Sequence, residues 1–173
     1  MKDLIYTRTM VTPLYGARAT SETGNVAMAA LHVLDRQPAP SVSEGGGWTA
    51  STLKGKSSLA TIGRMRWSLG KDNMVGAVVS DRTVMDSTLR HHLAGVDGRV
   101  SLTEAINLEG AVLGSSTSGD GQDGRLSPAA ILRARANSRH VQSMLEARYI
   151  SPGFRTENGF QPLADWVSVG NDT

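Results

Sequence analysis

The chain has 173 residues with a net charge of +2, and 39% of its residues are hydrophobic while only 5% are aromatic. This length and apolar content suffice for one hydrophobic core of ordinary size, so we expect one compact domain with appendages. The charged fraction of 20% excludes bulk disorder, and no apolar run approaches the ~20 residues of a membrane-spanning helix. No apolar stretch follows the first lysine, as a secretory signal requires, so we expect a protein of the cytoplasm or of a virion without a membrane partner.

The absence of cysteine restricts the chemistry that the chain can perform. It excludes disulfide bonds, thiolate zinc sites, iron–sulfur clusters and cysteine nucleophiles. The stretch GSSTSG at residues 114–119 does not match Gly-x-Ser-x-Gly, because its glycines are five residues apart. We therefore expect no cofactor and no catalytic residues, although an active site assembled from scattered residues stays open.

The first elements expected along the chain are a strand and a helix. Residues 4–11, LIYTRTMV, are rich in β-branched and aromatic residues and predict a strand. Residues 25–36, NVAMAALHVLDR, contain good helix formers and predict a short amphipathic helix. Residues 37–47 include two prolines and three consecutive glycines, which predict a loop.

A β-hairpin is expected next. Residues 64–69, RMRWSL, alternate between apolar and polar side chains, which predicts a half-buried strand. A four-residue loop at residues 70–73 then leads into residues 74–80, MVGAVVS, whose apolar character predicts a central strand buried on both faces. The side chains expected on the buried face of the first strand are those of Met65, Trp67 and Leu69.

The pattern after the hairpin predicts alternating helices and strands. In residues 82–94, apolar side chains recur at spacings of four, which indicates a helix. A capping box formed by Ser101 and Glu104 predicts a second helix, extending to about residue 108, and residues 111–114 follow as a short strand. The fold class expected is α/β or α+β, a small mixed sheet with an antiparallel hairpin and flanking helices.

The domain boundary is placed in a stretch rich in glycine and serine. Residues 115–126 contain few large apolar side chains to offset the entropy of ordering, so we interpret them as a linker after a core domain at residues 1–114. Residues 127–173 form the expected C-terminal part, a basic helix extending to about Tyr149 followed by an irregular aromatic arm.

The stretch ASTLKGKS at residues 50–57 matches a relaxed phosphate-loop pattern. Such a loop binds phosphates through backbone amides, with Lys56 as a point charge and Ser57 on magnesium, and it needs a strand before it and a helix after it. The preceding residues do not predict a strand. An exposed basic loop is the favoured interpretation.

Two aspartates and two histidines cluster in the sequence at Asp81, Asp86, His91 and His92. Adjacent histidines point about 100° apart on a helix, so they cannot both bind one metal ion from that geometry. We therefore expect one capping and one solvated aspartate, one partly buried and one exposed histidine, and no metal site.

Charge is unevenly distributed along the chain. Residues 71–124 carry a net charge of −4, whereas residues 125–155 carry +5 because six arginines there accompany the single acid Glu146. A segment of this kind can bind phosphate or an acidic surface of the same chain or of a neighbouring protomer. The candidate nucleic-acid-binding residues are Arg64, Arg66, Arg133, Arg135, Arg139 and Arg148.

Two functions are compatible with these features. We expect a non-catalytic structural or assembly protein, such as a component of a bacteriophage or virus particle, which self-associates or binds other structural subunits through its C-terminal segment. The alternative is a non-specific nucleic-acid-binding or RNA-binding module that uses the arginine-rich helix. The candidate partner-binding residues are Leu145, Tyr149, Phe154, Phe160 and Trp166.

Overall fold

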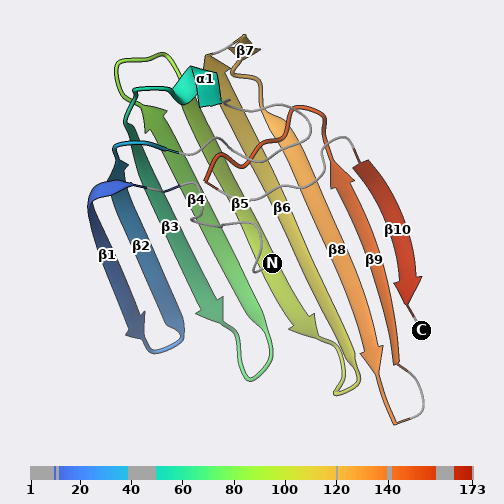
Figure 1. Ribbon diagram of the computed structural model, residues 1–173. Helices are drawn as coiled ribbons and strands as arrows, with labels where there is room; N and C mark the ends of the chain where they lie inside the picture. Colours follow the sequence, from blue (N-terminus) through green and yellow to red (C-terminus); the bar gives the residue numbers. More distant parts are fainter. Residues whose placement is uncertain are drawn as a thin grey trace.

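The computed structural model describes residue 10 and residues 12–38, 50–119, 121–139, 142–158 and 166–172. Within them the chain forms one antiparallel sheet of ten strands in the order β1-β2-β3-β4-β5-β6-β8-β9-β10, with the short β7 paired only with β6 (Figure 1). The only helix in these residues is the four-residue α1, Ala50–Leu53. The protein is therefore a single layer of strands, each beside its neighbours in the chain.

The strands are long for a chain of this size. Apart from β7 and β10, they contain 9 to 14 residues. Their bounds are β1 Pro13–Thr23, β2 Val26–Asp35, β3 Ser58–Ser68, β4 Met74–Val84, β5 Arg90–Ser101, β6 Ile106–Gly119, β7 Gln122–Asp123, β8 Ser127–Asn137, β9 Gln142–Ile150 and β10 Trp166–Asp172.

The predicted α/β fold is wrong, because the described residues form an all-β structure. The helix predicted at residues 25–36 is β2, the one at residues 82–94 is the end of β4 and the start of β5, and the one at residues 127–149 is β8 and β9. The predicted capping-box helix is the turn between β5 and β6 and the start of β6. Apolar residues spaced by four share one face of a strand as well as one face of a helix, since four is an even number.

The sheet extends into the predicted linker at residues 115–126, because β6 ends at Gly119 and β7 occupies Gln122–Asp123. Its first residues extend β6, and β6 pairs with β8 from Ile106↔Ala136 to Ser115↔Ser127. The predicted strand at residues 4–11 lies outside the described residues apart from Met10, as do residues 39–47 of the predicted loop.

The predicted hairpin is confirmed. β3 and β4 pair from Ser58↔Val84 to Ser68↔Met74. β4 is an interior strand, as expected, but only alternate residues along it are buried. The predicted burial of Met65, Trp67 and Leu69 is wrong, because their exposed fractions are 46%, 52% and 44%. Alternation shows which side chains share a face, but not which face is covered.

The two ends of the sheet differ. At one end, drawn lower in Figure 1, short turns join β1 to β2, β3 to β4, β5 to β6 and β8 to β9. At the other end β2 ends and β3 begins, and there also lie α1 and the crossing segment described next. The connections at this end are longer, since residues 36–57 separate β2 from β3 in the sequence.

One face of the sheet is covered near the end with the long connections. The chain leaves β9 and crosses the sheet as residues 151–158, hereafter the crossing segment (Figure 1). Its Phe154 is 1% exposed and completes the main hydrophobic cluster. The other members of that cluster are Val78, Leu93, Ala111, Leu113, Ala129 and Ile150. A smaller cluster joins Leu53 of α1 to Val84 and Leu89.

Candidate functional site

The face of the sheet opposite the crossing segment is apolar, and no described residues cover it. Strand pairing aligns its side chains in rows across β2 to β9, because directly opposed residues point to the same side. Val96, Val112 and Leu132, near its centre, are 57%, 58% and 57% exposed. We call this surface the apolar face. It consists of Val26, Met28, Ala30, Gly63, Met65, Trp67, Val75, Ala77, Val79, Ala94, Val96, Gly98, Val100, Ile106, Leu108, Gly110, Val112, Gly114, Ala130, Leu132, Ala134, Ala136, Leu145 and Ala147.

A row of polar residues borders the apolar face toward the long connections. His32 Nδ1 lies 2.9 Å from Thr61 Oγ1, and His92 Nδ1 lies 2.5 Å from the Asp81 carboxylate. Ser116 continues the row opposite His92. Charged groups on this side of β2 to β9 thus lie only beyond one edge of the apolar face.

Two shallow hollows are formed in this side of the sheet. One, of about 520 Å³, is lined in part by the small residues Gly98, Gly110 and Ala130. The other, of about 480 Å³, is lined in part by the small residues Ala30 and Gly63. Both arise where small residues sit beside larger side chains in neighbouring rows. The apolar face is therefore uneven, with hollows into which parts of a binding partner fit.

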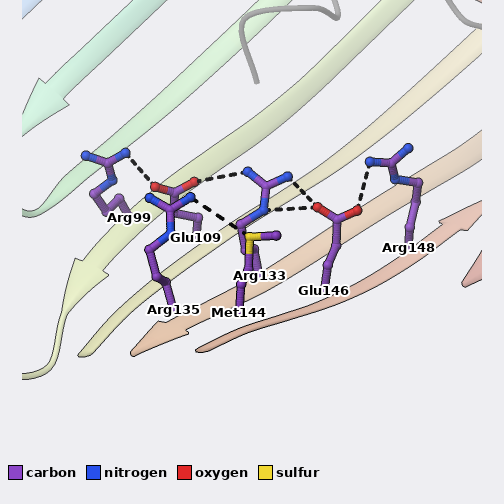
Figure 2. Close-up of polar contacts among 7 residues, drawn as sticks. All are labelled: Arg99, Glu109, Arg133, Arg135, Met144, Glu146 and Arg148. Atoms are coloured by element: carbon purple, nitrogen blue, oxygen red, sulfur yellow. Dashed lines mark hydrogen bonds and ion pairs between the residues drawn. The ribbon is translucent and has the colours of Figure 1, made fainter. Parts of the chain in front are cut away.

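The covered side of the sheet has a different character toward the short turns. There a chain of ion pairs crosses β5, β6, β8 and β9, as Figure 2 shows. Its members, which we call the charged ladder, are Arg99, Glu109, Arg133, Glu146 and Arg148. Directly opposed residues of neighbouring strands carry opposite charges here, at Arg99↔Glu109, Glu109↔Arg133 and Arg133↔Glu146. Such cross-strand pairs stabilise the register.

Glu146 lies at the centre of two of these contacts. Arg133 donates to it, and Arg148 Nη2 donates to its Oε1 at 2.9 Å. Burial alone raises the pKa of the Glu146 carboxyl, but the hydrogen bond from Arg133 and the positive charges of Arg148 and Arg133 outweigh it, so the pKa is lowered. Glu146 is therefore ionised at neutral pH.

The candidate nucleic-acid residues do not form one free basic surface. Arg133 and Arg148 are engaged in the charged ladder, and Arg64 forms a two-pronged contact with Asp97, whose Oδ2 accepts from Nη2 at 2.7 Å. Arg66 and Arg135 lie on the same side of the sheet and are exposed, and Arg139 is exposed in the turn between β8 and β9.

The candidate partner-binding residues are also divided. Leu145 is on the apolar face and Tyr149 borders it, and these two are 49% and 46% exposed. Phe154 is buried in the core on the other side. Trp166 opens β10, which pairs with β9, and Phe160 lies outside the described residues.

The predicted Asp/His group is divided between the two sides of β4 and β5. Asp81 and His92 belong to the polar row, whereas His91 is fully buried on the opposite side, where its Nδ1 lies 2.9 Å from Thr117 Oγ1. Burial lowers the pKa of His91 to about 3, assisted by the positive charges of His92 and Arg82. Within the described residues, no group of three or more His, Cys, Asp or Glu side chains could hold a metal ion.

The stretch at residues 50–57 lacks the surroundings of a phosphate loop. Its helix, α1, lies inside the pattern, and the element that follows is strand β3. Lys56 Nζ donates to Ser87 Oγ at 3.3 Å in the connection between β4 and β5. The nucleotide interpretation is therefore not supported.

Sequence reasoning missed the apolar face and the two acids of the charged ladder. The signal for the apolar face and for Glu146 is the alternation within LRARA and LEARY, where charged and apolar residues exchange at every position. This pattern was interpreted as a thin helical stripe.

No helix in the described part of the chain has the length and apolarity needed to cross a bilayer. No protein-family model, no curated protein and no solved structure matches the chain.

Proposed function

We propose that the chain is a non-catalytic structural protein whose working surface is the apolar face, and that lipid acyl chains cover this face. The observation that carries the proposal is the absence of charge from the face across seven consecutive strands of the sheet order, β2 to β9. Fully burying one exposed Val or Leu side chain contributes about 1.5–3 kcal/mol, so a face of this size needs an apolar environment.

The composition of the apolar face favours lipid over a protein partner. Protein interfaces carry about one hydrogen bond per 100–200 Å² and include polar side chains. Among the residues that make up the apolar face, Trp67 alone has a side chain with a hydrogen-bonding group, and it lies near the short-turn end of β3. Ser143, opposite Ala136, borders the face at the same end. Acyl chains require no such groups.

The height of the apolar face is that of a hydrocarbon layer. On β6 it extends from Ile106 to Gly114, roughly 27 Å at ~3.4 Å per residue, against ~30 Å for a bilayer core. Trp67 lies near the end of β3 at the short turns. Tyr149 lies near the end of β9 at the other end of the sheet. Amphipathic aromatic rings are enriched at both boundaries between lipid and water.

Contact with lipid requires that the polar backbone groups at the ends and edges of the sheet are satisfied. The short turns leave little polar backbone to carry across an apolar layer, and the strand ladders satisfy the backbone groups between them. β1 and β10 each have one neighbouring strand among the described residues, so in lipid their outer edges need further strands.

The proposal keeps the non-catalytic structural class expected from the sequence and changes the surface and the partner. The role in a virus particle and self-association through the C-terminal segment stay predictions. The nucleic-acid alternative is weakened, because Arg64, Arg133 and Arg148 are engaged with carboxylates.

Flotation with vesicles of dioleoylphosphatidylcholine tests the proposal. The full chain, diluted from urea into these vesicles, is expected to float with them. Met28→Glu is expected to reduce the floating fraction several-fold, because a carboxylate replaces a side chain of the apolar face. Ala29→Glu is the matched control, since the adjacent residue is exposed on the opposite side of the same strand and its substitution leaves flotation unchanged.

Tryptophan quenching locates the lipid. With Trp48 and Trp166 replaced by Phe, the fluorescence of Trp67 is expected to fall in vesicles whose acyl chains carry bromine. A protein that stays out of the vesicles and sediments as a discrete dimer would overturn the proposal and assign the face to a second copy. Equal loss of flotation in Met28→Glu and Ala29→Glu would also contradict it.

A further inference from the structure

A polar hollow of about 250 Å³ lies beside the charged ladder, on the side of the sheet opposite the apolar face. It is near the short turns, and three arginines contribute to its lining. The residues around it are Asp72, Arg99, Asn107, Glu109, Arg133 and Arg135. Nothing in the proposed contact with lipid uses this hollow.

Positive charge is in excess around the hollow. Glu109 is shared, because Arg99 Nη2 donates to it at 2.5 Å while Arg133 Nη1 lies 3.8 Å from its other oxygen. Glu146 is likewise shared between Arg133 and Arg148. Two carboxylates thus serve three guanidinium groups of the ladder, and Asp72 is the one further acid at the hollow.

Arg135 adds a fourth guanidinium group at the hollow. Its Nη2 makes a weak contact with the Met144 sulfur at 4.0 Å, and no carboxylate lies within ion-pair distance of it among the described residues. Figure 2 shows the guanidinium groups of Arg99 and Arg135 on the same side of the sheet near Glu109. A planar guanidinium group with donors to spare is suited to phosphate and carboxylate oxygens.

Asn107 supplies a neutral donor at the same place. Its Oδ1 accepts from Ser101 Oγ at 2.5 Å, which orients the amide and leaves the Nδ2 hydrogens for another acceptor. The hollow therefore combines guanidinium donors with an oriented amide donor.

We propose that this hollow binds a small multivalent oxyanion of the phosphate class, with Arg135, Arg99 and Asn107 as its main donors. Phosphate offers several acceptor oxygens to these donors, and its negative charge is attracted by the excess positive charge around the hollow. Two of the six residues that line the hollow, Asp72 and Glu109, are acids, which favours a compact anion over an extended polyanionic strand. This inference stands on the charged ladder and is independent of the proposed lipid contact.

Isothermal titration calorimetry with inorganic phosphate and with pyrophosphate tests the site, using the full chain in a non-ionic detergent that contains no phosphate. Pyrophosphate is expected to bind more tightly than phosphate, and sulfate to compete where chloride at equal ionic strength does not. Arg135→Gln is expected to weaken pyrophosphate binding about 10-fold to 100-fold, the effect of losing a charge-assisted hydrogen bond. Because Arg135 has no carboxylate partner, this substitution leaves the ladder intact.

Arg66→Gln is the matched control, since it removes the same charge from the same side of the sheet outside the hollow. Its pyrophosphate affinity is expected to equal that of the unmodified chain. Equal weakening in both variants would show a diffuse electrostatic effect and overturn the site. Absence of binding to either anion would overturn it as well. Binding of a single-stranded oligonucleotide without binding of pyrophosphate would overturn it in favour of a nucleic-acid surface.

Discussion

Arg82 on β4 donates a hydrogen bond through Nη1 to the backbone carbonyl oxygen of Glu157, at 2.7 Å and across 75 residues of sequence. The guanidinium group also donates through Nε to Ser58 Oγ at 3.4 Å. Burial lowers the pKa of Arg82, while the negative charges of Glu157 and Asp35 oppose that shift. This buried cation thus ties the crossing segment to the middle of the sheet.

Replacing Arg82 by Gln is expected to destabilise the fold by about 3–5 kcal/mol, because the acids and the carbonyl around it lose their partner. Urea unfolding followed by circular dichroism measures the change in the free energy of unfolding. Arg66→Gln, at an exposed position of β3, is expected to stay within about 0.5 kcal/mol of the unmodified chain. Similar values for the two variants would contradict the burial of Arg82.

Phe154→Ala is expected to cost about 3–5 kcal/mol, since the ring fills the cluster between the crossing segment and the sheet. Leu132→Ala, on the apolar face, removes a side chain that is already 57% exposed. In a lipid-free measurement it is expected to cost less than 1 kcal/mol, because little buried surface is lost. A large cost for Leu132→Ala without lipid would mean that another part of the chain covers the apolar face.

Gly95→Ala probes the close approach of β5 to β6. A Cβ at this position would lie 2.7 Å from the backbone carbonyl oxygen of Val112, which cannot move without disturbing the hydrogen bonds between the strands. We expect a loss of about 1–3 kcal/mol in the free energy of unfolding. Gly110→Ala is the control, because its Cβ would meet its nearest neighbour at 3.7 Å, an ordinary contact. Unfolding of Gly95→Ala and Gly110→Ala at the same urea concentration would contradict this prediction.

The buried His91 predicts a pH dependence. Its pKa is lowered to about 3, so between that value and the ordinary 6.5 the unfolded chain binds a proton that the folded chain does not. Stability is therefore unaffected by this group above pH 6.5 and falls as the pH decreases toward 3, by up to ~1.4 kcal/mol per pH unit. The free energy of unfolding measured at pH 7, 6 and 5 checks this slope before most carboxylates titrate.

His91→Gln is expected to flatten that slope, because the amide does not titrate. His32→Gln, at an exposed histidine of the polar row, is expected to leave the slope unchanged. A slope that persists in His91→Gln would assign the pH dependence to another group.

The sequence was sufficient to predict the β3–β4 hairpin, because RMRWSL alternates strictly and is followed by a turn and an apolar run. It was insufficient for β5, because Leu89, just before this strand, and Leu93 within it are four residues apart and fit both a helix and a strand. Alanine-rich runs such as those of β2 and β8 add helix propensity, which pairing with neighbouring strands overrides.

The candidate site was harder to predict, because it depends on which residues meet across strands. The pairing of Arg133 with Glu146 follows from a register that only the folded hairpin defines. Serines and glycines near residue 115 indicated a linker. In the structure Ser115 is buried, and its Oγ accepts a hydrogen bond at 2.9 Å from the backbone amide of Arg155 in the crossing segment.

The order of strands has a consequence for how the chain folds. Each long strand pairs with the strand that precedes it in the sequence, β7 aside, so the sheet can grow by addition of one strand after another. The loop closures are short at one end of the sheet and longer at the other, where residues 36–57 separate β2 from β3. The contact between Arg82 and Glu157 cannot form until β9 is in place. We therefore expect the crossing segment to dock late and to slow unfolding more than it speeds folding.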